Sequence, residues 1–593
     1  MAVTLSGMTL YTNNDNEGGW GGTDGPDTYN VAVQGTNSES WLVSKNSSET
    51  GTLTLTPGTA PGTTRSLFIF WMKSDLEYYY TDIQAELQST ASNYKTFVVA
   101  TAAVPDISGD FKPIALDYVN KGTSTGTYAP ASHTVTRIIV DNSSSGNIRS
   151  VTNNWIDVMY FGAGHAIAGT TTGDLLFSEA AAIDQNGTNE YGILNNFEGI
   201  IFSQGDIDLT GTALTSDGET LVFIDTANGY DRYNFDITGT ATFVDTAIRA
   251  SGTVDFDMDA SGATAFSMTG GSLTQGNQLT LATGQTLSGV VLTDQNLSSI
   301  TNTPLNCTWN ISGLVTLQTG GTLDTCTLSN STSTASVLTD DLADLTDCIF
   351  ISDGSNHAVE LSSLGSGTMA WANYLTSYAG SDGSTGNEAI YVNVGSGTLT
   401  INVTAGYDTP YIRTAGATVT VVAGAVTTIV TCVTTAGAPI QSARVLLRAA
   451  DATADFPFRE TVTITRVTST ASVAHTAHGM ANGDKVQIRQ AVQQEYNGVW
   501  VISNVTTNAY DYTLVGTPTT PATGSIISTW VALEGLTDVN GEIEMSRVIA
   551  TDQPVTGWGR KSSASPYYAQ GSINGTIDNI LGFSSTAALI LDE

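Results

Sequence analysis

The stretch LNCTWNISGLVTLQTGGTLDTCTLSNSTSTASVLTDDLADLTDCIF, residues Leu305–Phe350, repeats one short pattern three times. Cys307, Cys326 and Cys348 each follow a polar residue and precede a β-prone pair, at separations of 19 and 22 residues. Val290 lies 17 residues before Cys307 in a similar small apolar context. A period near 20 residues with two or three short strands per repeat is typical of a parallel β-helix, in which equivalent side chains stack from coil to coil. We therefore expect the cysteines to form an inward-facing ladder.

Similar short repeats extend over residues 201–410, which we predict to be a β-helix-like solenoid. Its recurring units are GTVDF (Gly252–Phe256), NQLTL (Asn277–Leu281), GLVTL (Gly313–Leu317) and GTLTI (Gly397–Ile401). The alternative role for the cysteines is a metal site. Zinc motifs need paired Cys or His residues two to four positions apart, and these cysteines are far more widely spaced. We interpret them as stacked core thiols.

The overall composition predicts an all-β protein. The chain has 593 residues, of which 60 are Gly, 13% are charged and 40% are hydrophobic. A disordered chain would be richer in charge and poorer in aromatic and β-branched residues. Short runs of Thr, Val, Ile, Tyr and Trp, cut by Gly, Asn and Asp, suit strands and tight turns. The length suggests roughly three to five structural units.

The charge balance excludes one class of partner. Lys and Arg total 20 against 56 Asp and Glu, which gives a net charge of −36. A protein that binds duplex nucleic acid needs a basic surface, because it displaces counterions from phosphates. We therefore expect no nucleic-acid partner. The acidity favours solubility and the binding of cations at a surface.

Targeting and membrane signals are weak. The first residues, MAVTLSGMTL, lack the basic and long apolar regions of a secretory signal. The uncharged stretch Thr414–Ala443 is rich in Thr, Ser and Gly and breaks at Ala423-Gly424. We predict two strands there and no membrane insertion. Four cysteines do not make a disulfide framework. These features predict assembly in a host cytoplasm.

Residues 1–200 are the most aromatic part of the chain and are predicted to form a β-sandwich. Trp41, Trp71 and Trp155 have apolar neighbours, as core residues would. The segment resembles the jelly-roll-like sandwiches of concanavalin-like and laminin-G-like domains. The predicted strands are Gly51–Pro57, Ser66–Asp75, His133–Asn142 and Asn154–Gly162.

Two separated segments, residues 411–460 and 530–593, are predicted to form one C-terminal sandwich. Val433–Asp451 has the pattern strand, turn, strand, and Glu534–Ile549 has the same pattern around an Asn-Gly pair. Together they resemble carboxypeptidase-regulatory-like and immunoglobulin-like domains. The matching residues are Gly437, Pro439, Ala443 and Val445 in the first segment and Thr537, Asp538, Asn540 and Gly541 in the second.

Residues 461–529 lie between those segments and are predicted to be an inserted small β module. Asn482-Gly483 and Asn497-Gly498 each predict a tight hairpin turn, because both turn positions require positive φ. A loop tip of a sandwich tolerates such an insertion. The pattern HGM, NGD and YNG resembles a small β module that recurs in virion proteins of tailed bacteriophages.

Two motifs suggest metal or catalytic sites. His475 and His478 could share a ligand with a third donor, but we favour His478 as a cap of the following turn. Asp255, Asp257 and Asp259 have half the pattern of a calcium loop and lack its downstream Glu. Their alternation with Phe and Met instead predicts a strand with an acidic outer face.

A polysaccharide-cleaving enzyme is the catalytic alternative. Glycosidases need two carboxylates roughly 5–9.5 Å apart. The chain offers many pairs without distinguishing one, and no nucleophile elbow, phosphate loop or zinc-protease motif occurs. We predict no catalytic, cofactor-binding or metal-binding residue. The pairs considered are Asp340 with Asp341, Asp347 with Asp353, and Asp324 with Asp347.

Near the C-terminus, Trp558, Arg560, Lys561, Tyr567 and Tyr568 concentrate basic and aromatic residues in an acidic chain. One interpretation is a contact patch for another subunit. The other is a sandwich hairpin whose Trp lies in its own core.

The resemblances of the last third of the chain imply a structural protein of a tailed-bacteriophage virion. The leading hypothesis is a non-enzymatic tail fibre or tailspike-like adhesin that contacts the host surface. The alternatives are a head decoration or head-fibre protein, a polysaccharide-cleaving tailspike, and a bacterial surface adhesin. The resemblance also implies a homotrimer or other homo-oligomer, contacts with other virion proteins, and a host glycan or protein as receptor.

Overall fold

The computed structural model confirms the predicted all-β class, with 60% of the chain in strands and 3% in helix. It describes residues 3–12, 20–22, 27–29, 38–43, 50–55, 66–74, 80–101, 111–142, 152–169, 175–185, 193–210, 214–351, 356–365, 367–369, 378, 387–405, 407, 409–450, 458–549 and 551–592. Among these residues, no helix is long and apolar enough to cross a membrane. The chain forms two compact units. The first comprises residues 1–365, 374–397 and 411–417, and the second comprises 366–373, 398–410 and 418–593.

The first unit begins with a two-layer sandwich. Strands β1 (Val3–Thr12), β4 (Ser38–Val43), β6 (Leu67–Ser74), β9 (Lys112–Asp117) and β12 (Thr152–Gly169) share one layer. The second layer has the order β10 (Thr123–Thr125), β8 (Asn93–Thr101), β7 (Tyr80–Thr90), β11 (Val135–Asn142), β5 (Thr50–Leu55), β2 (Trp20–Gly22). A core of Phe68, Phe70, Leu87, Phe97 and Phe161 fills the space between the layers. Trp71 and Trp155 are buried as predicted, and the side chain of Trp41 lies outside the described residues.

Strand β12 joins the sandwich to the solenoid. It pairs antiparallel with β1, β4 and β6, and its last residues pair in parallel with β15 (Asp206–Leu209). The one sheet therefore continues from the sandwich into the coils. Helix α1 (Phe177–Gln185) follows β12, and Glu219 accepts the N–H groups of Phe177 and Ser178 at its N-terminus, both over 3.0 Å. Phe177 is buried 5.7 Å from the ring of Phe243, so the helix covers apolar side chains of the first coils.

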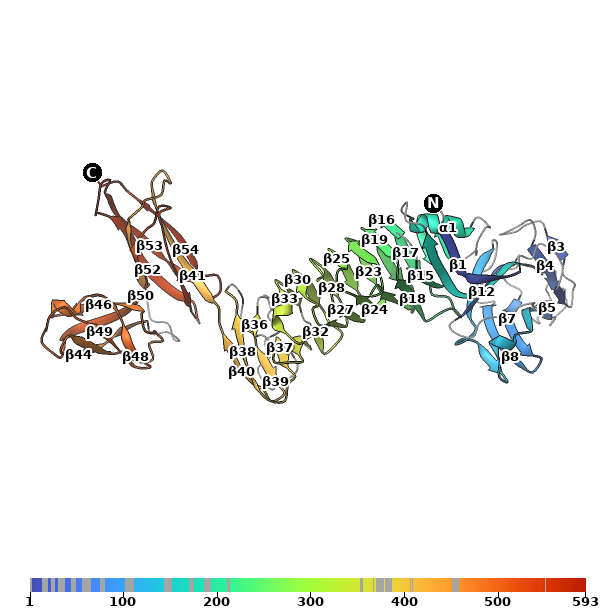
Figure 1. Cartoon of the computed structure of the whole chain (residues 1–593), viewed down its shortest axis with the longest axis horizontal. Helices are drawn as coiled ribbons and strands as arrows, with labels where there is room; N and C mark the ends of the chain where they lie inside the picture. Colours follow the sequence, from blue (N-terminus) through green and yellow to red (C-terminus); the bar gives the residue numbers. More distant parts are fainter. Residues whose placement is uncertain are drawn as a thin grey trace. The chain divides into compact units, whose positions relative to one another are not determined.

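The solenoid is a parallel β-helix with three ladders of strands (Figure 1). The first ladder is β15, β18 (Arg232–Ile237), β21 (Asp255–Asp259), β24 (Gly276–Leu281), β27 (Leu297–Ile300), β29 (Leu314–Leu317), β32 (Ala335–Thr339), β35 (His357–Leu361), β37 (Ile390–Val392) and β39 (Ile412–Thr414). The second includes β14 (Ile200–Ser203), β17 (Thr220–Phe223), β20 (Ala247–Ala250), β23 (Ser272–Thr274), β26 (Val291–Thr293), β28 (Thr308–Asn310), β31 (Thr327–Ser329) and β34 (Ile349–Ile351). The third includes β16 (Leu214–Asp217), β19 (Thr240–Val244), β22 (Ala265–Thr269) and β25 (Thr286–Ser288), with β30 (Leu323–Asp324) and β33 (Leu345–Thr346) paired separately.

The cysteines form the ladder that their spacing predicts. Cys307, Cys326 and Cys348 are at most 1% exposed, as is Val290. Backbone N–H groups one position after each cysteine donate to the carbonyl of the preceding rung, which is Val290, Cys307 and Cys326 in turn. The four side chains therefore occupy equivalent positions on successive coils. All the cysteines are free thiols.

The second unit holds a short parallel sheet and two further layers. The sheet is β36 (Thr368–Met369), β38 (Thr398–Val403) and β40 (Thr418–Val422). One layer is β51 (Glu542–Val548), β41 (Ala425–Thr434) and β54 (Phe583–Leu589). The other has the order β47 (Gly498–Val501), β46 (Lys485–Ala491), β50 (Gly524–Leu536), β42 (Arg444–Ala449), β52 (Gln553–Lys561), β53 (Tyr568–Ile577).

Strand β50 is shared by the predicted insertion and its host sandwich. It pairs with β46 on one side and with β42 on the other, and it runs through the predicted boundary between residues 529 and 530. A four-stranded sheet completes the inserted segment, with the order β44 (Thr463–Val467), β45 (Thr470–Ala474), β49 (Ala509–Thr513), β48 (Ser503–Thr506). One apolar core, which includes Val445, Ile488 and Trp530, spans the host and the inserted segment.

Neither Asn-Gly pair of the inserted segment forms the predicted two-residue hairpin, although Asn482-Gly483 does form a tight turn in which the Asp484 N–H donates to the carbonyl of Ala481 over 3.1 Å. Asn482-Gly483 precedes β46, whose sheet differs from that of β45. Asn497 has φ −75° and follows the 3-10 turn Gln494–Tyr496, so the β46–β47 connection is longer than two residues. Its side chain instead closes that loop by bonding the N–H and the carbonyl of Ala491, over 2.9 and 2.8 Å. These side-chain hydrogen bonds hold the loop closed, and Asn497 does not adopt the positive φ that a type I′ turn requires.

Candidate functional site

The outer side of the first ladder is polar over the strands β15, β18, β21 and β24. Strands β15, β18 and β21 alternate strictly between buried side chains and outward ones. The outward residues are in register, so they stand in rows across neighbouring coils, about 4.8 Å apart. We call this surface the solenoid face. Its first row is Asp208, Asp236, Asp259, Thr280, Ser299 and Thr316.

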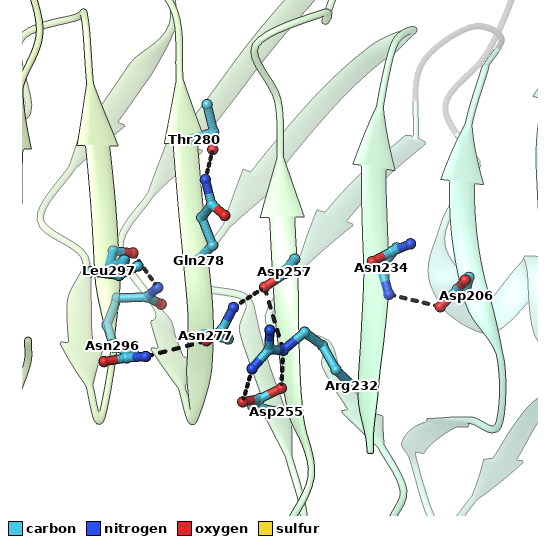
Figure 2. A network of polar contacts seen from close by, with 11 residues as sticks. Asp206, Arg232, Asn234, Asp255, Asp257, Asn277, Gln278, Thr280, Asn296 and Leu297 are labelled. Carbon is cyan, nitrogen blue, oxygen red and sulfur yellow. Dashed lines mark hydrogen bonds and ion pairs between the residues drawn. The ribbon is translucent and has the colours of Figure 1, made fainter. Parts of the chain in front are cut away.

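A second set of outward side chains lies beside that row (Figure 2). Arg232 Nε and Nη2 donate to the two carboxylate oxygens of Asp255 over 2.7 and 3.1 Å. The same Nε lies 3.9 Å from Asp257 Oδ1. On the preceding coil, Asp206 Oδ1 accepts the backbone N–H of Asn234 over 2.7 Å. These contacts hold planar carboxylates in defined orientations.

A bulge extends the network toward the next coils. The register between β21 and β24 shifts between Phe256 and Asp257, which leaves Asn277 as the extra residue. Its Nδ2 donates to Asp257 Oδ1 over 2.5 Å, and its Oδ1 accepts from Asn296 Nδ2 over 3.2 Å. The three side chains thus form a chain of hydrogen bonds across three coils, visible in Figure 2.

The electrostatics of the face are acidic. Six aspartates lie on β15, β18 and β21 at the start of the ladder, and two of them, Asp255 and Asp257, lie within 4 Å of the Arg232 guanidinium. Burial raises the pKa of the Asp208 carboxyl, whose buried Oδ1 has no hydrogen-bond partner among the described residues. A face of this sign attracts cationic groups and disfavours anionic ligands. The six are Asp206, Asp208, Asp236, Asp255, Asp257 and Asp259.

The predicted acidic strand is confirmed. Asp255, Asp257 and Asp259 lie on β21 and point outward, while Phe256 and Met258 are 1% exposed. Asp255 and Asp257 face Arg232, and Asp259 Oδ1 accepts the N–H of Ser261 over 2.8 Å. Within the described part of the chain, no group of three His, Cys, Asp or Glu side chains is arranged to hold a metal ion.

The sequence interpretation missed the neighbours of that strand. The alternation in DIDL (Asp206–Leu209) and NFDI (Asn234–Ile237) matches DFDMD, and it was the available signal. What it could not supply was the register that places Asp208, Asp236 and Asp259 in one row.

The described carboxylates that we considered for glycoside cleavage lie between strands of the solenoid or at the end of a strand. Asp341 caps a 3-10 turn by accepting the N–H of Ala343 over 2.9 Å. Asp324 is in register with Thr346, so Asp347 lies one position beyond it on the next coil. Asp353 lies outside the described residues. The described contacts of these residues do not distinguish an acid from a base.

His478 caps its turn as predicted, since its Nδ1 accepts the N–H of Met480 over 3.1 Å. His475 lies beside it, with ring centres 5.3 Å apart, and its Nε2 is 3.7 Å from Glu460 Oε2. Both imidazoles are 1% exposed and pack against Tyr510. Burial lowers the pKa of His478. The pair is therefore part of the folded core of the inserted segment.

The basic and aromatic residues near the C-terminus lie on and beside β52 and β53. Lys561 stands opposite Tyr568 across these strands. A Cβ on Gly559 would meet Cys432 Sγ in the core, so its half-buried neighbour Trp558 points away from the core. Tyr567 is 47% exposed and Arg560 is exposed. The outward Trp558 favours a contact patch over a core hairpin.

The second unit also has a cavity of about 240 Å³ between β46, β50 and β51. Three of its four charged lining residues, Asp484, Lys485 and Glu534, form ion pairs. Lys485 Nζ lies 2.9 Å from Glu534 Oε2, and Asp484 is in contact with Arg547. These ion pairs satisfy most of the charge that lines the cavity, so we assign it no ligand.

A scan against protein-family models and a search of the curated proteins found no match. Solved structures match weakly. A family 11 carbohydrate-binding module from Clostridium thermocellum, in complex with a mixed-linked tetrasaccharide, covers 26% of this chain and 95% of its own, with 11% identity and a TM-score of 0.20. TmCBM61 in complex with β-1,4-galactotriose covers 26% and 97%, with 12% identity and a TM-score of 0.18. The catalytic domain of a GH87 α-1,3-glucanase in complex with tetrasaccharides covers 72% and 98%, with 8% identity and a TM-score of 0.16. Likenesses at these TM-scores carry no argument about function.

Proposed function

We propose that this chain is a non-enzymatic adhesin of a tailed-bacteriophage virion and that the solenoid face holds a glycan of the host surface. The observation that carries the binding proposal is the in-register row Asp208, Asp236 and Asp259, continued by hydroxyl side chains on the next coils. Rows of this kind offer repeated acceptors and donors along an extended polymer. The ligand is a neutral or amino-sugar glycan, because an anionic one would face the carboxylates.

The geometry of the carboxylates supports binding. Arg232 and Asn277 already orient Asp255 and Asp257, so little side-chain freedom is lost when a ligand hydroxyl donates to them. Hydrogen bonds to charged groups are also stronger than neutral ones. A pre-oriented polar surface on a rigid sheet is suited to holding a polysaccharide.

The virion assignment rests on the resemblance of the C-terminal segments to phage modules. The β-helical stack supplies a stiff scaffold without disulfides, which suits an appendage assembled in a cytoplasm. Self-association into a homotrimer or other homo-oligomer is part of this proposal. Head decoration remains the second location, and a cryo-EM map of the particle separates the two. Density for this chain at the tail supports the adhesin, and density on the capsid lattice overturns it.

The binding proposal is tested on an array of neutral, amino-sugar and uronate-containing bacterial surface oligosaccharides. The full chain is compared with Asp236→Asn/Asp259→Asn, and Asp217→Asn is the matched control on the exposed end of β16. We expect the double variant to lose about tenfold or more in affinity, about 1.4 kcal/mol, and the control to be unchanged. Equal binding by all three proteins would overturn the role of the face. Release of new reducing ends would overturn the non-enzymatic part.

A further inference from the structure

Positive charge gathers on the outer side of the sheet that joins the inserted segment to its host. Trp530 of β50 packs in the core, so the next residue, Val531, points to the other side of the sheet. Lys485 of β46 and Arg448 of β42 lie on either side of Val531, because directly opposed residues of an antiparallel pair share a face. The same pairing along β42, β43 (Arg459–Thr461), β46 and β52 places six basic residues on this side, which we call the arginine face. The six are Arg444, Arg448, Arg459, Lys485, Arg489 and Arg560, out of 20 Lys and Arg residues in a chain of net charge −36.

Three arginines from three strands converge at the centre of the arginine face. Arg448, Arg459 and Arg489 are all half-buried, as expected where the stems lie along the sheet and the charged heads reach water. Burial, together with repulsion from Arg448 and Arg459, lowers the pKa of Arg489. Burial and repulsion from Arg459 likewise lower the pKa of Arg448. The three positive charges are therefore close enough to destabilise one another.

The described residues leave the charge of two of these arginines uncompensated. Arg448 Nη1 donates to a neutral acceptor, Gln487 Oε1, over 2.7 Å. Within the ranges that the structure describes, neither Arg448 nor Arg489 has a carboxylate partner. An anionic group that accepts from both would relieve the repulsion, and hydrogen bonds between charged groups are stronger than neutral ones. The planar fork of arginine matches the two oxygens of a carboxylate.

The acidic side chain of this face is paired at its edge. Glu534 is the one Asp or Glu among the described outward residues of β42, β43, β46, β50 and β52. Its two oxygens lie 2.7 Å from Arg444 Nη2 and 2.9 Å from Lys485 Nζ. Glu460 of β43 points to the opposite side of the sheet, where its Oε2 is 3.7 Å from His475 Nε2. The arginine face is therefore positive although the chain is acidic.

An aromatic side chain lies beside the central arginines. Trp558 of β52 is half-buried and points outward, and it is opposite Leu446 of β42. Arg448 is opposite Thr556, two residues before Trp558, so the indole and Arg448 are diagonal neighbours on adjacent strands. An indole offers an apolar ring face with a polar N–H at its edge. The arginine face thus combines positive charge with a surface on which a sugar ring can lie.

We infer that the arginine face binds an acidic oligosaccharide, in which Arg448 and Arg489 hold a uronate carboxylate and Trp558 contacts a neighbouring sugar ring. A neutral sugar would leave the arginines uncompensated. An inorganic anion would make no use of the indole. Duplex nucleic acid would bring a dense line of phosphates to a chain of net charge −36, which repels it.

This inference goes beyond the proposed function and does not rest on it. The solenoid face belongs to the first unit and is acidic, whereas the arginine face belongs to the second unit and is basic. The two surfaces share no residue and prefer ligands of different charge, so each can fail without the other.

The test compares uronate-containing oligosaccharides with their carboxyl-reduced forms on the full chain. Arg448→Gln/Arg489→Gln removes two charges and keeps much of each stem, and Trp558→Ala removes the ring. Arg249→Gln and Tyr411→Ala are matched controls at exposed positions of the first unit. We expect the parent to bind the uronate forms about tenfold more tightly than the reduced forms, and the arginine variant to lose that preference. Trp558→Ala should weaken the binding of both forms, and the controls should behave as the parent.

Several outcomes would overturn the site. Equal binding of the two forms by the parent would do so, and so would a preference that survives in the arginine variant. Loss of uronate binding with Asp236→Asn/Asp259→Asn alone would assign the ligand to the solenoid face. Inorganic phosphate or sulfate that competes with the uronates equally well in the parent and in Trp558→Ala would show a simple anion site. Tighter binding of duplex DNA, or self-association in sedimentation that the arginine variant abolishes, would assign the face to another partner.

A second variant keeps the test decisive if the arginine variant unfolds. Arg560→Gln changes an exposed residue of the same face, two positions after Trp558. We expect it to reduce the preference for the uronate forms, and added salt to weaken their binding to the parent. An unchanged preference in Arg560→Gln together with salt-independent binding would count against the site.

Discussion

Arg232 forms a bidentate ion pair with Asp255 of the next coil. Its Nε and Nη2 donate to the two carboxylate oxygens over 2.7 and 3.1 Å. The two residues are 23 positions apart in the chain and are direct partners in the parallel ladder. The pair therefore joins two coils at the most acidic part of the solenoid face. The side chains are 45% and 34% exposed, so water and salt weaken their attraction.

Arg232→Ala should lower the thermal stability of the first unit at low salt. Asp255 and Asp257 would then repel each other without a neighbouring cation. An exposed pair contributes up to about 1 kcal/mol, so we expect a small shift that shrinks as salt is added. Calorimetry of Arg232→Ala at two salt concentrations measures it, with Arg249→Ala as the control. A shift that is equal at both concentrations would contradict the electrostatic explanation.

Trp309→Ala should destabilise the middle of the solenoid. The indole is 1% exposed, stacks between Leu292 and Leu328 on neighbouring strands, and donates to Ser298 Oγ over 3.3 Å. Truncating a buried Trp costs about 3–5 kcal/mol. Hydrogen exchange should accelerate in β26, β28 and β31. Trp309→Phe should have a smaller effect, and the second unit should be unchanged in both variants.

The second unit should lose stability in acid through His478. Burial lowers the pKa of His478 below its unfolded value, so the unfolded state binds the proton more readily. The stabilising contribution of the neutral imidazole is present above the unfolded pKa of about 6.5, and it is lost as pH falls toward the lower folded pKa. His475, Asp484 and Tyr510 lie near His478, and Glu460 faces His475.

His478→Asn checks this, because its side-chain oxygen could still accept the N–H of Met480. Thermal melts of the second unit between pH 7 and pH 5 should fall less steeply in this variant than in the parent. Parallel slopes would assign the acid sensitivity to another group.

Gly541→Ala should destabilise the second unit more than Gly437→Ala. Both glycines have positive φ, 77° and 82°. A Cβ at position 541 would lie 2.5 Å from the carbonyl oxygen of Cys432, whereas one at 437 would meet no atom within 4 Å. The control therefore isolates the backbone strain of about 1–2 kcal/mol, and Gly541→Ala adds a steric clash. Chemical denaturation measures the difference, and equal losses would refute the clash.

The four thiols should not react with an alkylating reagent in the native protein at pH 8. All are buried, and burial raises the pKa of Cys348 to about 12 and that of Cys432 to about 11. The thiolate is the reactive form. Mass spectrometry should find four modified cysteines only after denaturation. Rapid labelling of the native chain would show that the coils open.

Part of the site could be predicted from the sequence. The strand of Asp255, Asp257 and Asp259 followed from strict alternation with apolar residues, which is a local property. The row that Asp259 joins did not follow from it. Successive members of the row, from Asp208 to Thr316, are separated by 28, 23, 21, 19 and 17 residues. Because the coil length varies, no fixed period identifies the neighbours.

The sequence by itself determined the β character of the chain, the stacked coils and the inward cysteines, because composition, alternation and a period near 20 residues are properties of the order of residues along the chain. Only the tertiary structure decided the register between coils and the sharing of β50 by the inserted segment and its host sandwich. Each of these depends on pairing between residues far apart in the chain. The Asn-Gly pairs make the same point, since the loop around Asn497 is closed by a contact with Ala491 and not by the turn that two adjacent residues prefer.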